Sequence, residues 1–194
     1  MSPGADMRVI AGSHKGRRLL QPPDRSVRPT SDRVKEALFS ILGSRILDAH
    51  FIDLYAGTGA IGIEALSRGA ARVSFVESHR ASLRLLRANL AQLRVISGAE
   101  VYACSAERFL RQHKQRGEPL PIMFADPPYA HTEALLPSLD RSAIITPDTI
   151  VVLEHATKTV LPARVGQLSL RRQYRYGDTT LSVFVMASEG FPAE

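Results

Sequence analysis

The feature that most constrains this chain is a regular alternation of short apolar segments with amphipathic ones. Periodicity predicts strands at 51–55, 72–77, 100–103, 121–126 and 149–154, with helices at 60–68, 79–93, 106–114 and 132–139 between them. Repeated strand–helix–strand units require a mostly parallel sheet with helices on both faces. Two last segments, 167–175 and 180–186, flank a turn and predict an antiparallel pair at one edge.

The first 35 residues differ from this pattern. Segments 8–12 and 17–20 predict two short strands joined by a turn, 21–29 reads as a proline-containing connector, and a helix from Thr30 or Ser31 to about Leu42 follows. Eight basic and three acidic residues lie in residues 1–35, which therefore hold +5 of the formal net charge of +6. Such a local excess is typical of a surface that binds a polyanion, and a solvated basic tail is the alternative.

Composition excludes several classes of protein. A chain of 194 residues with 44% hydrophobic content predicts one packed domain, with room for a small appendage. The apolar runs are too short for a transmembrane helix, and the N-terminus lacks a signal peptide's apolar core. Because Cys104 is the single cysteine, a disulfide framework is excluded, and the histidines show no metal spacing. We therefore expect a cytoplasmic protein without a membrane partner or a metal.

The loop after the first predicted strand has the pattern of a nucleotide-binding loop. Gly57, Gly59 and Gly62 satisfy G-x-G-x-x-G between a strand and a helix, and Glu77 ends the next strand. An acid at that position can accept both hydroxyls of a ribose. Asp53 precedes the glycines and would repel a pyrophosphate, whereas it suits the ammonium of a methionine group. The pattern therefore favours S-adenosylmethionine over a dinucleotide.

The fourth predicted strand ends in Asp126-Pro127-Pro128-Tyr129. The two prolines fix φ and remove two backbone donors, so the loop offers acceptors, the Asp126 carboxylate and the Pro127 carbonyl. Tyr129 offers a flat face on which a base can stack. This combination suits an exocyclic amine, which brings two N–H donors.

These motifs resemble those of the class I S-adenosylmethionine-dependent methyltransferases that methylate amino groups. The chain is more similar still to the bacterial small-subunit ribosomal RNA guanine-N2 methyltransferases. Segments that carry this second resemblance span almost the whole chain, at 8–12, 15–17, 28–30, 32–39, 53–59, 126–129 and 176–179.

The resemblance implies a Rossmann-like α/β fold with a seven-stranded sheet and a small N-terminal β-hairpin extension. It divides the chain into a basic arm over residues 1–29 and a methyltransferase domain over residues 30–194. It also implies S-adenosylmethionine as the cofactor, bound by Thr30, Asp53, Ala56, Gly57, Gly59, Glu77, Ser105 and Ala106. The family commonly has Asp where Ser105 stands, so the adenine amine would meet a weaker, uncharged acceptor here.

The expected reaction is in-line methyl transfer to guanine N2, with Asp126, Pro127 and Tyr129 as catalytic residues. The partner implied is 16S ribosomal RNA, in the small subunit or an assembly intermediate, and the protein is expected to be a monomer. RNA phosphates need a basic surface. We assign RNA binding to Arg8, His14, Lys15, Arg17, Arg18, Arg28 and Arg33.

Three other readings remain open on the sequence. A DNA adenine-N6 methyltransferase shares the Asp-Pro-Pro-Tyr loop, although 194 residues leave little room for a target-recognition domain. A nicotinamide-dependent oxidoreductase fits the glycine loop but leaves the Asp-Pro-Pro-Tyr loop unexplained. A non-catalytic RNA-binding module would not need the intact Asp126 and glycine loop.

Overall fold

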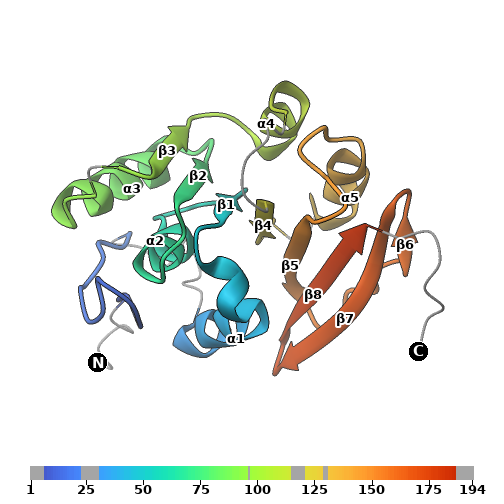
Figure 1. Cartoon of the computed structure of the whole chain (residues 1–194), viewed down its shortest axis with the longest axis horizontal. Helices are drawn as coiled ribbons and strands as arrows, with labels where there is room; N and C mark the ends of the chain where they lie inside the picture. The colour runs from blue at the N-terminus through green and yellow to red at the C-terminus, as the bar shows by residue number, and fades with distance from the viewer. Residues whose placement is uncertain (1–6, 23–30, 96, 115–120, 129–130, 187–194) are drawn as a thin grey trace. The chain divides into compact units, whose positions relative to one another are not determined.

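The computed structural model describes residues 7–22, 31–95, 97–114, 121–128 and 131–186. The chain forms two compact units, Met1–Ala106 and Glu107–Glu194, whose elements are drawn in Figure 1. None of the helices in the described ranges has the length and apolar character needed to cross a membrane.

The first unit contains strands that pair in parallel in the order β3-β2-β1. Its elements are α1 (Asp32–Leu42), the 3₁₀ helix η1 (Gly43–Ile46), β1 (His50–Asp53), α2 (Ala60–Ser67), β2 (Arg72–Val76), α3 (Arg80–Gln92) and β3 (Ala99–Tyr102). Phe51, Ile52 and Phe75 are fully buried, as expected of strands covered on both faces. The Ser31 side chain accepts a hydrogen bond from Val34 N and thereby caps α1.

The second unit contains strands in the order β4-β5-β8-β7-β6. Its elements are α4 (Ala106–Gln112, which begins one residue before the unit), β4 (Pro121–Ala125), α5 (Thr132–Asp140), β5 (Ile150–Ala156), β6 (Arg164–Val165), β7 (Leu168–Tyr176) and β8 (Thr179–Met186). Strands β4 and β5 are parallel, whereas β8, β7 and β6 join them by antiparallel pairing.

The predicted alternation is confirmed, and the bounds of the predicted strands and helices from β1 onward differ from the observed ones by no more than two residues. One detail was wrong. The described residues contain eight strands instead of seven, because the two-residue β6 pairs with β7 and is too short to show periodicity. The predicted N-terminal hairpin is present but small: one antiparallel bridge joins Arg8 and Arg18, and Val9 N and Leu19 N donate to the Arg17 and Met7 carbonyls at 2.9 and 2.8 Å.

The N-terminal segment, residues 7–22, is fastened to α2 by a buried carboxylate. Glu64 is fully buried, and its two carboxylate oxygens accept hydrogen bonds from Ile10 N at 2.7 Å and Ala11 N at 3.0 Å. Arg68 Nε lies 2.7 Å from the same carboxylate and balances its charge. The hydroxyl of Ser67, also on α2, donates a hydrogen bond to the carbonyl oxygen of Ala11. Figure 1 accordingly shows this segment beside α2.

A buried lysine makes a similar contact from α1. Lys35 is only 1% exposed, and its Nζ donates to the Arg8 carbonyl oxygen at 2.7 Å. Asp32 Oδ1 lies 3.2 Å from the same ammonium and neutralises it. The N-terminal segment is therefore part of the packed first unit.

A histidine network connects β1, β2 and β3. Arg72 donates to His50 Nδ1 at 3.0 Å, so the neutral ring carries its proton on Nε2, which lies 2.9 Å from Ser74 Oγ. Burial, followed by the charge of Arg72, lowers the pKa of His50 from 6.5 to about 4, while Glu100 acts in the opposite direction. Burial also lowers the pKa of His155 on β5.

Replacing Glu64 by Gln should lower the free energy of unfolding by about 2–4 kcal/mol, because a neutral amide leaves buried N–H groups poorly paired. Glu36 on the exposed side of α1 offers the matched control, and Glu36→Gln should change stability by less than about 0.5 kcal/mol. Urea titration measures both values. Equal stability of the two variants would contradict the anchoring role of Glu64.

Stability should fall as the pH drops from about 6.5 toward 4. The unfolded chain takes up a proton at His50 in this window while the native protein does not, so protonation favours unfolding. Between pH 7 and pH 5 we expect this residue to contribute about 1–2 kcal/mol. The His50→Gln variant should lose that part of the pH dependence in urea titrations. An unchanged pH profile in this variant would contradict the assignment.

Candidate active site

The glycines of the loop between β1 and α2 have separate structural roles. Gly57 and Gly59 have φ values of +54° and +86°, in the left-handed region that favours glycine. A Cβ on Gly59 would lie 2.3 Å from Leu86 Cδ1, whereas one on Gly57 would meet nothing within 4 Å. Gly59 is thus required by packing inside the protein, and Gly57 borders open space where a ligand can approach.

Gly62 is required for contact between α2 and β2. A Cβ there would lie 2.3 Å from the Phe75 ring and 2.8 Å from Val73 Cγ1. Its backbone N–H donates to Asp53 Oδ2 at 3.1 Å, so the buried carboxylate occupies the N-terminal turn of α2. A phosphate would ordinarily bind at such a helix terminus. Asp53 therefore makes the site unfavourable for a pyrophosphate.

Glu77 fastens the glycine loop to the chain that follows β2. Its two carboxylate oxygens accept hydrogen bonds from Gly57 N at 2.8 Å and His79 N at 2.7 Å. Because a carboxylate has about four acceptor positions, these two bonds leave capacity for hydroxyl donors. The half-buried side chain combines a fixed orientation with remaining acceptor capacity.

Asn89 on α3 is a site residue that the sequence analysis missed. It is fully buried, and its Nδ2 donates to the Thr58 carbonyl at 3.0 Å and to the Leu20 carbonyl at 3.1 Å. Its Oδ1 accepts from Leu20 N at 2.7 Å. One amide therefore holds both the glycine loop and the N-terminal segment. An asparagine at a core position of an amphipathic helix was the signal that could have revealed it.

Two further candidates lie between β3 and α4. Ser105 is exposed, and Ala106 is buried at the first position of α4. The backbone N–H of Glu77 donates to the Tyr102 carbonyl, which links the acid to the end of β3. Asp53 is the last residue of β1, and the loops that follow β1, β2 and β3 hold the other candidates, Ala56, Gly57, Gly59, Glu77 and Ser105.

The second unit presents the Asp-Pro-Pro loop directly after β4. Asp126 is exposed, Pro127 is buried, and Pro128 is exposed, with the Pro128 carbonyl accepting a hydrogen bond from His131 N at 2.7 Å. The loop is thereby fastened to the start of α5. A rigid loop with an accessible carboxylate is suited to bind an amine.

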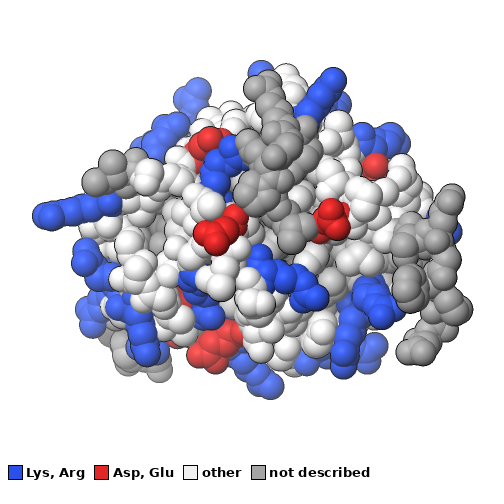
Figure 2. Space-filling model, in the orientation of Figure 1, with Lys and Arg blue, Asp and Glu red and all other residues white. Residues whose placement is uncertain are grey.

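The predicted RNA-binding residues come from the N-terminal segment and α1. Lys15, Arg17, Arg18 and Arg33 are exposed, and His14 is half-buried. Arg8 is exposed but lies 3.4 Å from Asp32, which reduces its net charge. Figure 2 shows Lys and Arg side chains gathered at the left of the visible face, over α3 and the N-terminal segment.

Three predicted site residues, Thr30, Arg28 and Tyr129, lie outside the described residues.

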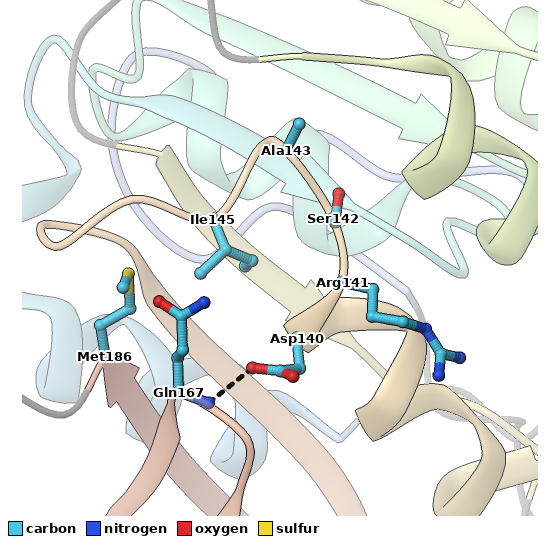
Figure 3. A pocket seen from close by; sticks show the side chains of 7 residues that line it. All are labelled: Asp140, Arg141, Ser142, Ala143, Ile145, Gln167 and Met186. Atoms are coloured by element: carbon cyan, nitrogen blue, oxygen red, sulfur yellow. Dashed lines mark hydrogen bonds between the residues drawn. The ribbon is translucent and has the colours of Figure 1, made fainter.

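A pocket of about 340 Å³ in the second unit is separate from the predicted site residues. Asp140 Oδ1 accepts a hydrogen bond from Gln167 N at 2.7 Å, as the dashed line in Figure 3 shows. A Cβ on Gly166 would lie 2.0 Å from Asp140 Oδ2, so this contact depends on glycine. The pocket is lined by Asp140, Arg141, Ser142, Ala143, Ile145, Gln167 and Met186. The contact joins the end of α5 to the start of β7 and has a structural role.

The acceptor groups around the glycine loop define the ligands that it can bind. Asp53 and Glu77 supply carboxylate acceptors, while Gly57 leaves space beside the backbone. These groups fit a ligand with a cationic amine and hydroxyls and disfavour a diphosphate. Within the described ranges, no cluster of three or more His, Cys, Asp or Glu residues could hold a metal ion.

Comparison with known proteins places the chain in a family. The family model described as "Conserved hypothetical protein 95" matches residues 7–185. YlbH of Bacillus subtilis is 38% identical over 92% of this chain and 98% of its own length. Ribosomal RNA small subunit methyltransferase D of Escherichia coli is 34% identical over 97% of this chain and 94% of its own length.

Solved structures show the same fold. The Escherichia coli protein yhhF has a TM-score of 0.81 and 32% identity, covering 94% of this chain and 98% of that one. An RNA methyltransferase from Salinibacter ruber shares the fold with a TM-score of 0.62 at 17% identity, covering 86% of this chain and 97% of that one. The chain therefore has the Rossmann-like fold of the class I methyltransferases and belongs to the family described as Conserved hypothetical protein 95.

Proposed function

We propose that this protein transfers a methyl group from S-adenosylmethionine to the exocyclic N2 amine of a guanine in 16S ribosomal RNA. The observation that carries this proposal is the accessible Asp126 carboxylate on a proline-fixed loop after β4, in a chain related over nearly its full length to small-subunit ribosomal RNA methyltransferases. The DNA adenine-N6 alternative is set aside, because the relatives named for a substrate are named for ribosomal RNA.

The cofactor is held by the first unit. The Asp53 carboxylate suits the ammonium of the methionine group, and Glu77 has capacity to accept the ribose hydroxyls. Gly57, with Ala56 and Gly59, forms the loop surface along which the cofactor lies. Ser105, Ala106 and Thr30 complete the proposed set. When bound, S-adenosylmethionine supplies an electrophilic methyl group on a sulfonium.

The target amine is oriented by the second unit. A guanine N2 lone pair is delocalised into the base, so the amine is a weak nucleophile. Hydrogen bonds from its two N–H groups to the Asp126 carboxylate and the Pro127 carbonyl orient the amine and localise that lone pair. Both acceptors also stabilise the positive charge that develops on nitrogen, so they bind the transition state more strongly than the ground state. Tyr129 stacks on the extruded base.

The remaining assignments concern partners and organisation. Residues 1–29 act as a basic RNA-binding arm, with Arg8, His14, Lys15, Arg17, Arg18 and Arg28 on it, and residues 30–194 as the methyltransferase domain, with Arg33 near its start. We expect a cytoplasmic monomer whose substrate is 16S ribosomal RNA within the small subunit or an assembly intermediate. The packing of residues 7–22 on α1, α2 and α3 supports an arm with a fixed orientation.

The substitution Asp126→Ala should reduce kcat by about 10²–10³-fold or more while S-adenosylmethionine affinity stays within about twofold. The conservative Asp126→Asn keeps one acceptor oxygen and should retain more activity than the alanine variant. Asp148→Ala, at an exposed aspartate before β5, is the control and should behave like wild type. Transfer of labelled methyl groups to unmodified small subunits, free 16S RNA and duplex DNA, followed by nucleoside analysis, measures the outcome. N6-methyladenine in DNA, or near-normal turnover of Asp126→Ala, would contradict the proposal.

Removing charge from the arm should weaken RNA binding without affecting the cofactor. Point substitutions are preferable to truncation, because deleting residues 1–20 would remove the backbone groups of Ile10, Ala11 and Leu20 that Glu64 and Asn89 bind. The triple variant Lys15→Gln/Arg17→Gln/Arg18→Gln should raise KM for RNA at least tenfold, since phosphate contacts dominate affinity. A matched variant, Arg45→Gln/Arg111→Gln/Lys114→Gln, should stay near wild type. Equal effects of both triple variants on KM for RNA would exclude a specific role for the arm.

A further inference from the structure

Strand β7 presents a basic and aromatic surface that the assigned site does not include. Its arginine side chains are all exposed and, among the described residues, none of them is in an ion pair. We call this edge of the sheet the β7 patch, formed by Arg171, Arg172, Tyr174, Arg175 and Tyr176. Arg172, Tyr174 and Tyr176 share one face of the strand, whereas Arg175 lies on the other. Figure 2 shows basic side chains at the lower right of the visible face, where Figure 1 places β7.

The β7 patch concentrates charge within a neutral unit. Residues 107–194 contain ten Lys or Arg and ten Asp or Glu, so the second unit has no formal net charge. Between residues 164 and 186, however, four basic residues face one acidic residue. Residues 107–116 have the same excess of four basic residues over one acidic residue, so charge is only the first property of the β7 patch. A positive surface of this kind is suited to bind a polyanion.

The backbone of β7 is also available on its outer side. β6 pairs only with Leu168 and Ser169, so in the described part of the chain no strand covers residues 171–176 on that side. Six residues of extended chain span about 16–20 Å, enough for more than one phosphate. Backbone N–H groups, arginines and tyrosine hydroxyls all donate hydrogen bonds to phosphate oxygens.

The aromatic residues give the patch a second property. The Arg172 guanidinium lies over the Tyr174 ring, 5.1 Å from its centroid, and Tyr174 is itself half-buried. Stacking restricts the guanidinium and presents its planar face. Arginine and tyrosine planes are the surfaces on which unstacked RNA bases lie. Charged side chains that only protect a sheet edge would not need this arrangement.

The patch begins at the edge of the unit where Asp126 lies. Asp126 follows the carboxyl end of β4, and β5 runs parallel to β4 with Ala125 opposite Leu153. The carboxyl end of β5 pairs with the start of β8, Ala156 opposite Thr179, and Thr157 N donates to the Asp178 carbonyl at 2.8 Å. The turn after Tyr176 therefore lies at the same edge of the sheet, and β7 ends there.

We propose that the β7 patch is a second RNA-binding surface, which contacts the ribose–phosphate backbone and unstacked bases flanking the target guanine. This inference rests on the proposed function, since the target amine is placed at Asp126. The basic arm contributes affinity from the first unit, while the β7 patch positions the RNA strand beside the loop that receives its base.

The test removes the charge of the patch and compares it with an equal loss elsewhere in the same unit. The variant is Arg171→Gln/Arg172→Gln/Arg175→Gln. The control is Arg111→Gln/Lys114→Gln/Arg141→Gln, whose residues are exposed and lie in the last turn of α4, just after α4 and just after α5. Affinity for 16S RNA is measured between about 50 and 200 mM salt, together with methyl transfer, S-adenosylmethionine affinity and thermal unfolding.

We expect the patch variant to bind RNA at least tenfold more weakly than the control. The slope of log K against the logarithm of salt concentration should become less steep by about 0.7 for each lost phosphate contact. Cofactor affinity and thermal unfolding should match those of the control. Tyr174→Leu should weaken RNA binding severalfold, and Tyr174→Phe, which keeps the ring, should restore most of that loss.

Two results would overturn the inference. One is RNA affinity and salt dependence equal to those of the control; the other is self-association of the patch variant with unchanged RNA affinity, which would assign the arginines to edge protection. Methyl transfer by the wild type is the separate readout for the proposed function. If the wild type methylates no RNA, that function fails, whereas the difference in binding between the two triple variants still decides the role of the patch.

Discussion

The first unit depends on the hydrogen bonding of buried backbone groups by side chains of its helices. Polar backbone groups removed from water must find partners, and the small N-terminal hairpin pairs only part of its own backbone. Glu64 pairs with Ile10 and Ala11, while Asn89 pairs with Leu20. These contacts make a segment with little regular secondary structure part of the fold.

Side-chain hydrogen bonds to the backbone also hold the glycine loop in place. Asn89 contacts the Thr58 carbonyl as well as Leu20, and the Thr58 hydroxyl lies 3.3 Å from Met7 Sδ. From the other side, Glu77 holds Gly57. The loop proposed to bind the cofactor is thus fixed by Glu77, which follows β2, and by the Asn89 amide, which also holds the N-terminal segment. A preorganised loop of this kind loses little further conformational freedom when a ligand binds.

Charge is distributed between the units in a way that fits an RNA substrate. The first unit holds the whole formal net charge of +6, and the second is neutral but has four of its ten basic residues between residues 164 and 186, on and near β7. The described Lys and Arg side chains of both surfaces are exposed and cost little stability, whereas the charges at the cofactor loop are hydrogen-bonded and buried or half-buried. Affinity for the polyanion and chemistry on one amine are therefore assigned to different residues.

The sequence alone was enough to predict the βαβ alternation, the Asp53–glycine–Glu77 loop and the acceptor-only loop at Asp126, because periodicity and backbone restriction are local properties. It did not reveal β6, whose two residues show no period. Asn89 and Glu64 were also missed as anchors, since their partners lie 53 to 69 residues away along the chain. Only tertiary structure decided those roles, because a buried polar side chain acquires its function from the groups that packing brings against it.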